Sequence, residues 1–220
     1  MSIKAIIVNR NLLSTLKQTV EFLSKESRVS IIIYDQQSTY PPLLEYYKTC
    51  SVEIVYSKVN GGPHSVWGND LKQHLEDYFI IADSDCSYEE VPDNWLDVML
   101  NIAKNNIKVG FSLDLDLPET SLKQNIIDWE SKFWINKNDQ GWIADIDTTF
   151  ALYPPNSPFT YRAIRLDKPY CIKHIPWYLT EENISDEWKY YLNNCSNIST
   201  WGNKLKNKID LKTTKLNTKS

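Results

Sequence analysis

The chain has 220 residues, of which 42% are hydrophobic and 24% are charged, so it is long enough for one substantial α/β domain and cramped for two. The composition is ordinary for a globular protein, and no apolar run approaches the length of a membrane span. The formal net charge of −4 argues against nucleic acid as the main partner.

The charge is distributed unevenly along the chain. Residues 203–220 contain six lysines and one aspartate and carry a formal charge of +5, whereas residues 1–202 carry −9. Because this C-terminal segment has no aromatic residue and is rich in Lys, Asn and Thr, we expect it to be disordered. A solubilising tail is the favoured role, and peripheral contact with an anionic membrane surface is the alternative.

The cysteines and the N-terminus bear on the compartment. The four cysteines show no close pairing and no CxxC motif, which predicts reduced thiols rather than disulfides or a zinc site. The N-terminus runs directly into an apolar segment without a signal peptide. We therefore expect a cytoplasmic protein.

The first half of the chain, residues 1–106, begins with alternating strands and helices. Strands are predicted at 3–8, 29–34, 52–56 and 78–82, and helices at 12–25, 43–47 and 65–76. Asn11 is the candidate N-cap of the first helix. The order β-α-β-α-β-α-β predicts a mostly parallel sheet with right-handed crossovers.

Each of these four strands ends in a polar break. Asn9–Asn11 follow the first strand, Asp35 the second, Asn60–His64 the third and Asp83–Asp85 the fourth. Ligands of such sheets bind outside the carboxyl ends of the strands, so the four breaks are expected to line one crevice. Their coincidence is a stronger signal than any one of them.

Asp83 and Asp85 flank Ser84 directly beyond the fourth predicted strand. Two carboxylates at i and i+2 that turn into one crevice repel each other unless a cation lies between or beside them. Mn²⁺ and Mg²⁺ favour such oxygen ligands and usually complete their shell with substrate phosphates. The motif therefore predicts a metal and diphosphate site, with a solvated acidic loop as the alternative.

The second half, residues 107–202, is less regular. Helices are predicted at 95–103, 120–135 and 184–193, and strands at 108–113, 148–153 and 161–165. Asp114 and Asp116 form a second Asp-x-Asp motif, which we expect to line an acceptor pocket. No repeat or linker marks a second domain, so residues 1–202 are predicted to form a single α/β domain.

With these segments placed, the chain resembles a glycosyltransferase of the GT-A type, close to the family-2-like bacterial and viral enzymes. The resemblance covers about residues 3–200. The motifs that carry it are Val8–Leu13, Asp35, Asn60-Gly61-Gly62, Asp83-Ser84-Asp85, Asp145–Phe150 and Lys173-His174. It implies a Rossmann-like, mixed and mostly parallel sheet flanked by helices. It also implies transfer of a sugar from a nucleotide-sugar, usually a UDP-sugar, to a glycan, a glycolipid or another hydroxyl acceptor.

The resemblance places the nucleotide-sugar in the first half. Asn9 and Arg10 would flank the base and ribose, and Asp35 would accept a hydrogen bond from the uracil N–H, since a carboxylate only accepts. The glycines of the Asn60–Gly62 loop would let the backbone approach the donor. A turn residue and an ordinary tight loop are the respective alternatives for Asp35 and for this loop.

The resemblance also implies a metal site. Asp83 would contact the ribose and the metal, and Asp85 would bind the metal directly. His174 would supply a further ligand, and imidazole beside carboxylates suits Mn²⁺ better than Mg²⁺. Lys173 would meet the phosphate charge. The alternative for His174 is a histidine packed under Trp177.

An inverting enzyme of this type also needs a base for the acceptor hydroxyl. Asp147 is the first choice and Asp145 the second, with two capping residues as the alternative. Trp134 and Trp142 are candidates to stack on the acceptor sugar, although a role in the core is favoured for each. Larger processive members carry membrane helices and a Gln-x-x-Arg-Trp motif, and the chain has neither, so we expect transfer of a single sugar.

Two other functions remain open from the sequence. A sugar-nucleotide nucleotidyltransferase would share the sheet, but it is expected to have a glycine-rich phosphate loop where this chain has Asn9–Asn11. A non-catalytic carbohydrate-binding module would explain eight Trp and thirteen Tyr residues, but not four polar breaks at strand ends.

Overall fold

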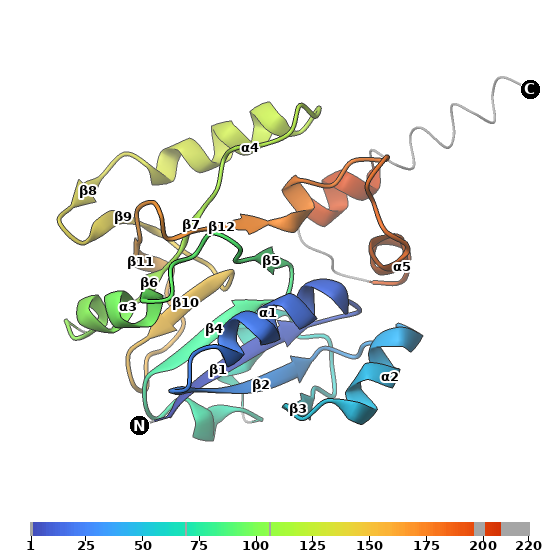
Figure 1. Ribbon diagram of the computed structural model, residues 1–220, viewed down its shortest axis with the longest axis horizontal. Helices are drawn as coiled ribbons and strands as arrows, with labels where there is room; N and C mark the ends of the chain where they lie inside the picture. The colour runs from blue at the N-terminus through green and yellow to red at the C-terminus, as the bar shows by residue number, and fades with distance from the viewer. Residues whose placement is uncertain (1, 69, 106, 196–200, 208–220) are drawn as a thin grey trace, which may run out of the picture.

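A mixed β-sheet forms the centre of the molecule in the computed structural model, which describes residues 2–68, 70–105, 107–195 and 201–207. Within these residues the large sheet has nine strands in the order β3-β2-β1-β4-β10-β6-β11-β9-β8 (Figure 1). Its strands are β1 (Ile3–Asn9), β2 (Val29–Asp35), β3 (Glu53–Tyr56), β4 (Phe79–Asp83), β6 (Val109–Gly110), β8 (Lys137–Asn138), β9 (Gly141–Asp145), β10 (Phe150–Tyr153) and β11 (Arg162–Arg165).

A small sheet and a set of helices complete the described fold. The small sheet has the order β5-β12-β7, with β5 (Cys86–Ser87), β7 (Ser112–Leu113) and β12 (Cys171–His174). The α-helices are α1 (Ser14–Ser24), α2 (Pro41–Thr49), α3 (Trp95–Ala103), α4 (Lys123–Glu130) and α5 (Asp186–Asn194). The 3₁₀ helices are η1 (Pro63–Trp67), η2 (Lys72–His74), η3 (Ser131–Phe133) and η4 (Ile175–Trp177). Residues 201–207 are also helical.

The first half of the sheet is parallel, as predicted. Strand β1 pairs in parallel with β2 and β4, and β2 pairs in parallel with β3. The register aligns Asn9 with Asp35 and Val8 with Asp83. The carboxyl ends of these strands therefore lie at one edge of the sheet, which brings the polar breaks together.

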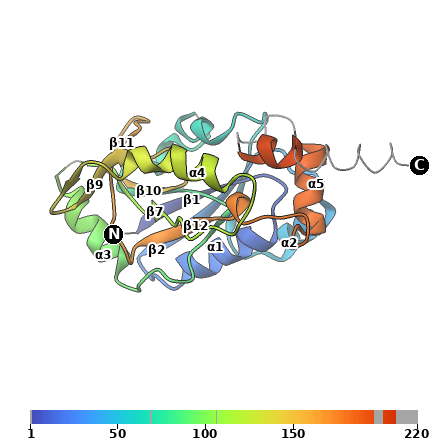
Figure 2. The same ribbon diagram turned by 90° about the horizontal axis from the view of Figure 1, so that it is seen from above.

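The central strands separate two hydrophobic cores. Ala5 and Ile7 of β1 belong to the core formed with α1, α2 and α3, which lie together on one side of the sheet (Figure 2). Ile6 belongs to the other core, formed with Val66 and Leu71 of the segment before β4. Because successive side chains of a strand point to opposite faces, burial on both sides explains the unbroken apolar runs.

Antiparallel strands extend the sheet beyond β4. Strand β10 lies between β4 and β6 and is antiparallel to both. Gly110 is needed in β6, because a Cβ atom there would lie 2.3 Å from the carbonyl oxygen of Phe150. The single strand predicted over 108–113 is wrong: the chain passes from the large sheet in β6 to the small sheet in β7.

Two local predictions in the first half are also wrong. The helix expected over 65–76 is replaced by the short turns η1 and η2, since the chain is extended at Gly68 (φ −76°, ψ 178°). Asn11 does not cap α1, because its φ is 56° and its side-chain oxygen accepts the N–H groups of Thr39 and Tyr40. Helix α1 begins instead at Ser14, whose N–H donates to the carboxylate of Glu187.

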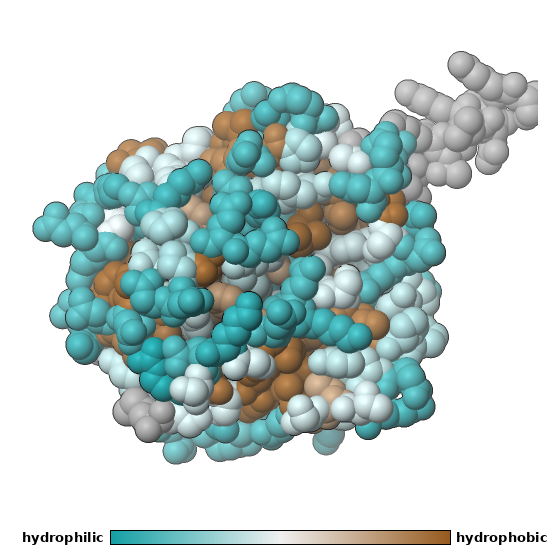
Figure 3. Space-filling view, in the orientation of Figure 1, coloured by the Kyte–Doolittle hydropathy of each residue, from teal (hydrophilic) through white to brown (hydrophobic). Residues whose placement is uncertain are grey.

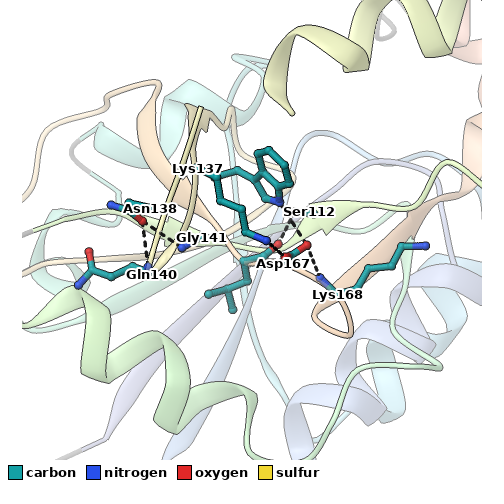
Figure 4. A network of polar contacts seen from close by, with 9 residues as sticks. Ser112, Lys137, Asn138, Gln140, Gly141, Asp167 and Lys168 are labelled. Carbon is teal, nitrogen blue, oxygen red and sulfur yellow. Dashed lines mark hydrogen bonds and ion pairs between the residues drawn. The ribbon is translucent and has the colours of Figure 1, made fainter. Parts of the chain in front are cut away.

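A polar network fixes the β8–β9 hairpin to the loop that precedes β12. Lys137 and the indole N–H of Trp142 both donate to the carboxylate of Asp167, and so does the N–H of Lys168 (Figure 4). The hairpin turn is closed by Asn138, whose side-chain oxygen accepts two backbone N–H groups. This part of the second half of the chain is therefore held by side-chain contacts as well as by strand pairing.

The start of the lysine-rich C-terminal segment packs on the fold. Leu205 is 1% exposed and lies in a cluster with Leu12, Trp188 and Leu192. The boundary expected at residue 203 is therefore too early, whereas the rest of the predicted tail, 208–220, lies outside the described residues. On the face drawn in Figure 3, hydrophilic side chains surround smaller hydrophobic patches, as on most folded surfaces. None of the described helices has the length and apolar character needed to cross a bilayer.

Candidate functional site

A cleft of about 1040 Å³ opens at the carboxyl ends of β1, β2 and β4. Its other walls come from α4, from the β9–β10 connection, from β12 and from the helix at 201–207. Its polar and charged lining includes Asn9, Arg10, Gln36, Asn60, Asp83, Asp85, Glu130, Asp145, Asp147, Arg165, His174 and Lys204. The cleft therefore gathers most of the residues predicted from the sequence, from segments far apart in the chain.

Asp83 is the last residue of β4 and lies in the middle of this cleft wall. Its carboxylate accepts the hydroxyl of Thr148 at 3.2 Å, and its N–H donates to the carbonyl of Thr149. Burial, and then the charges of Asp85 and Asp147, raise the pKa of Asp83 well above its ordinary value. Three carboxylates therefore repel one another here, and a cation would relieve that repulsion.

Asp85 lies next to His174 in the lining of the cleft. The Nε2 atom of His174 lies 3.3 Å from Oδ2 of Asp85, and β12 pairs with β5 so that His174 lies opposite Cys86. Burial lowers the pKa of His174, but the Asp85 carboxylate outweighs it, and the net pKa is raised. The ring also packs at 5.0 Å against Trp177, so the packed-histidine alternative is confirmed, and it is compatible with the position of His174 beside Asp85.

No group of three or more His, Cys, Asp or Glu side chains in the described part of the chain is arranged to hold a metal ion. Of the three predicted ligands, Asp85 and His174 lie within contact distance of each other, whereas the carboxylate of Asp83 accepts a hydrogen bond from Thr148. Such a partial set fits Mn²⁺ or Mg²⁺, which take one or two protein carboxylates and draw further ligands from substrate phosphates. Cys86 adds no ligand, because burial raises the pKa of its thiol well above its ordinary value.

The two candidate bases are Asp145, the last residue of β9, and Asp147, two residues beyond it, and both line the same cleft. Asp147 is exposed, and its Oδ1 accepts both the N–H and the hydroxyl of Thr149, at 3.0 and 2.5 Å. The protein atoms around the carboxylate reduce its hydration, which acts to raise its pKa. The two hydrogen bonds from Thr149 outweigh this effect, so the pKa of Asp147 is lowered. Asp145 is also exposed and lines the cleft. Asp147 thus caps its own turn while facing the cleft, so the capping alternative and the cleft prediction are compatible.

Lys108 supports the turn that carries Asp147. Its ammonium group donates to the carbonyl oxygens of Ile146, Asp147 and Thr160 at 2.6, 2.7 and 2.9 Å. The side chain also lies over the ring of Tyr153, at 4.6 Å from its centre. Burial lowers the pKa of Lys108 to about 7. This lysine is not marked by any motif in the sequence.

The end of the cleft at β1 and β2, where the nucleotide is expected, differs from the prediction at Asp35. Asp35 is 2% exposed and does not line the cleft, because its carboxylate accepts the hydroxyl of Tyr47 and the N–H of Ser38, both at 2.9 Å. Asn9 does line the cleft, and its side-chain N–H donates to Tyr47 at 2.9 Å. Gln36, which the sequence did not single out, occupies the wall where Asp35 was expected.

The glycine loop contributes to the cleft in part. Asn60 and Gly62 line it, as does Arg10, and Gly62 has a φ of 67° that favours glycine. Gly61 instead donates its N–H to the side chain of Gln36, and a Cβ atom at Gly61 would lie 2.8 Å from the side chain of Ser65. The loop therefore supports the wall as well as forming it.

Lys173 lies away from this cleft, which corrects its predicted contact with the phosphates. Alternation along β12 places His174 in the cleft and Lys173 on the other face, 3.8 Å from Glu90 and 4.0 Å from Glu89. Lys173 lines a separate cavity of about 550 Å³. Asp114 and Asp116 line the same separate cavity, so they do not share a pocket with the cleft carboxylates.

The sequence did not identify the aromatic wall of the cleft. Trp134 and Trp142 pack on each other at 5.4 Å, and neither lines the cleft. Trp129 and Phe133, at the end of α4 and in η3, line it instead, and Trp129 is 52% exposed. Tyr161, which is also exposed, is a third aromatic residue in the lining of the cleft. No spacing rule distinguishes these residues from their packed neighbours.

A buried ion pair lies at the foot of α4. The carboxylate of Glu130 accepts a hydrogen bond from Arg165 at 2.8 Å, and both side chains line the cleft. Burial raises the pKa of Glu130 despite the neighbouring guanidinium. The pair fixes the end of the helix against β11, which positions the aromatic wall.

Comparisons with solved structures agree with this architecture. A mannosyltransferase, PcManGT from Pyrobaculum calidifontis, in complex with GDP-Man and Mn²⁺, is similar with a TM-score of 0.53 at 10% identity over 86% of this chain and 59% of that chain. TarS residues 1–349 from S. aureus has a TM-score of 0.42 at 15% identity over 88% of this chain and 56% of that chain. The chain thus spans less than two thirds of either protein. A 4-diphosphocytidyl-2C-methyl-D-erythritol synthase from Anaerococcus prevotii has a TM-score of 0.39 at 12% identity over 70% of this chain and 71% of that chain.

No protein-family model and no curated protein matches the sequence. The likeness to the mannosyltransferase nevertheless rests on the element order and sheet described above, since so little of the sequence is identical. The mixed sheet, flanked by helices and opening its cleft at the ends of β1, β2 and β4, has the GT-A fold of nucleotide-sugar transferases.

Proposed function

We propose that this chain is a metal-dependent glycosyltransferase of the hexosyltransferase type, which moves one sugar from a UDP-sugar to the hydroxyl group of a glycan or glycolipid. The observation that carries the proposal is the meeting of Asp85 and His174 beside Asp83, at the carboxyl end of β4 and in the same cleft as Asn9. The fold supports it, and the mannosyltransferase of similar fold was solved with a nucleotide-sugar and Mn²⁺.

Asp85 and His174 would hold the metal, and Asp83 would join them or contact the ribose. A bound divalent ion neutralises the charge that develops on a departing diphosphate. The residues of this chain do the rest: the cleft walls orient the donor, and Arg10 and Lys204 place positive charge along the cleft. The separate cavity at Lys173 takes no part in this scheme.

We assign Asp147 as the base and Asp145 as the alternative, and we expect inversion at the anomeric carbon. The lowered pKa keeps Asp147 ionised at neutral pH, but it also makes the carboxylate a weaker base than usual. Proton transfer from the acceptor hydroxyl should therefore come late, when the bond to the sugar has already acidified that hydroxyl. Trp129 and Phe133 form the wall on which an acceptor sugar would stack.

Donor cleavage in the presence of Mn²⁺ tests the proposal. The protein is incubated with UDP-sugars, and with GDP- and dTDP-sugars for comparison, and release of the nucleoside diphosphate is followed with and without EDTA. Asp85→Asn should abolish metal-dependent release, whereas Asp114→Asn, in the separate cavity, should retain it. Release that survives EDTA or Asp85→Asn would contradict a metal-dependent transferase.

The same assay separates the base from the metal site. Asp147→Asn should bind donor and metal normally yet lose transfer, and Asp145→Asn reports on the alternative. If pyrophosphate is formed from a nucleoside triphosphate and a sugar phosphate, the protein is a nucleotidyltransferase. Binding of glycans without nucleotide or metal, and no turnover, would indicate a carbohydrate-binding module.

A further inference from the structure

Two buried polar atoms at the nucleotide end of the cleft lack a hydrogen-bond partner. They are the side-chain oxygen of Asn9 and the side-chain nitrogen of Gln36. Asn9 is 1% exposed and Gln36 is 2% exposed, and both residues line the cleft. A buried polar group without a partner costs about 1–3 kcal/mol, so two of them in one wall call for a ligand that satisfies both.

The orientation of the Asn9 amide follows from its neighbours. The carboxylate of Asp35 can only accept, so the Tyr47 hydroxyl, 2.9 Å away, must donate its single proton to it. Tyr47 can then only accept from Asn9, which therefore presents its NH₂ group to Tyr47 at 2.9 Å. The Asn9 oxygen is left as a bare acceptor. Burial, and next the charge of Asp35, raise the pKa of Tyr47, which keeps this hydroxyl protonated.

The Gln36 amide is oriented in the same way. Its oxygen accepts the N–H of Gly61 at 3.1 Å and lies 3.4 Å from the hydroxyl of Ser65. The NH₂ group must then be the unpartnered end, and it acts as a donor. The two residues are adjacent, because the backbone N–H of Gln36 donates to the backbone carbonyl of Asn9 at 2.8 Å. One acceptor and one donor, each with a fixed orientation, thus share one wall.

We propose that Asn9 and Gln36 read the base of the nucleotide-sugar and select uracil, an inference that rests on the proposed function. The ring N–H of uracil has a carbonyl on each side. Its N–H can therefore donate to Asn9 while either carbonyl accepts from Gln36. Adenine and cytosine place a ring nitrogen acceptor where uracil has this N–H, so that atom faces the Asn9 oxygen as a second acceptor. Guanine has a ring N–H with a carbonyl on one side only. The pair therefore disfavours adenine and cytosine, and uracil is assigned over guanine on the basis of the proposed UDP donor. Asp35 acts through Tyr47 as a positioning residue and does not touch the base.

The contact needs a small adjustment of the wall. Both unpartnered atoms are shielded from bulk solvent, so a base reaches them by displacing a neighbouring side chain. A base gains the full binding free energy only when it forms a hydrogen bond with both unpartnered groups. A base that leaves one of them unpaired binds more weakly, which makes the pair selective.

Calorimetric titration with Mn²⁺ and four probes tests the inference: UDP, GDP, ADP and inorganic pyrophosphate, which has no base. The wild type should bind UDP at least about tenfold more tightly than ADP. Gln36→Glu replaces the donor by an acceptor and keeps the contact with Gly61. It should weaken the binding of UDP about tenfold or more and leave the affinity for pyrophosphate unchanged. Gln37→Glu, at an exposed neighbour, is the control for added charge.

Tyr47→Phe tests the positioning role. It frees the Asn9 amide to rotate, so the preference for UDP over ADP should shrink while pyrophosphate binding stays unchanged. Equal affinities of the wild type for UDP and ADP, or tighter binding of GDP than UDP, would overturn the uracil assignment. So would normal UDP binding by Gln36→Glu, or an equal loss of UDP and pyrophosphate. Failure of the wild type to bind any of the probes would instead count against the proposed function.

Discussion

Lys108 shows how one side chain can hold in place the part of the cleft wall that carries Asp147. It is 3% exposed, and its three N–H groups meet the carbonyl oxygens of Ile146, Asp147 and Thr160. These carbonyls belong to the β9–β10 connection and to the loop before β11. The lysine therefore adds three contacts between two loops that adjoin the paired ends of β9 and β11, and one of these loops carries the proposed base.

Replacing Lys108 by methionine should destabilise the protein while preserving most of the side-chain volume. The variant leaves three carbonyl groups without their donor, and each such loss costs on the order of 1–3 kcal/mol. We expect the free energy of unfolding to fall by about 2 kcal/mol or more, measured by urea titration. Lys104→Met, at an exposed position on the end of α3, should change it by less than about 0.5 kcal/mol. Equal midpoints for the two variants would show that the lysine is not a support.

Single residues could be predicted from the sequence where one type has one dominant chemistry. Asp83, Asp85 and His174 line the cleft as expected. The two aspartates could be placed because they follow a predicted strand directly, and the histidine because the resemblance implies a metal ligand at that position. Asp35 was assigned to the base, but it does not line the cleft, since its partner Tyr47 lies on another element and takes its free oxygen. Gln36 was missed for the complementary reason: its role comes from the N–H of a glycine that approaches it in the folded chain.

At the scale of elements, the helix at 201–207 is the least expected part of the cleft. Its Trp201 packs at 5.7 Å from Trp177, which in turn packs on His174. Lys204 lies 4.1 Å from the centre of the Trp201 ring, and both residues line the cleft. This contact chain links the C-terminal helix to the proposed metal site.

Truncation should separate this helix from the lysine-rich remainder. A chain ending at residue 207 should unfold at the same urea concentration as the full chain, because the sequence predicts disorder for 208–220. A chain ending at residue 200 should be clearly less stable, since it loses Leu205 from its cluster. Leu205→Ala should cost about 2 kcal/mol or more, against a smaller loss for Leu44→Ala at 38% exposure. Equal stability of the two truncated chains would show that the helix is not packed.

The predictability of the elements followed the strength of their pattern. The parallel half was predicted well, because β1, β2 and β4 are apolar on both faces and separated by helices or turns. The apolar spacing within 65–76 is also real, as Val66, Leu71 and Leu75 are buried, but Gly68 prevents it from forming a helix. The two-residue strands β5, β7 and β8 have no pattern to detect, since only pairing across the fold creates them.

For the whole molecule, the main consequence is that the proposed metal site has too few protein ligands on its own among the described residues. Asp85 and His174 come from the two halves of the chain and are brought together by the pairing of β12 with β5. No third His, Cys, Asp or Glu of the described residues completes a metal site with them. A diphosphate would add the missing oxygens, so metal and nucleotide are expected to bind cooperatively.

This cooperativity predicts a pattern in thermal and urea unfolding. Mn²⁺ alone and UDP alone should each stabilise the protein little, whereas both together at about one hundred times their joint dissociation constant should add about 2.7 kcal/mol. EDTA should remove the whole increment, and Asp85→Asn should prevent it. The variant lowers the carboxylate repulsion on Asp83 but also removes the charged partner of His174, so its own stability without ligands serves as the baseline for the increment. Additive effects of Mn²⁺ and UDP would mean that they bind at separate places and that the cleft does not join them.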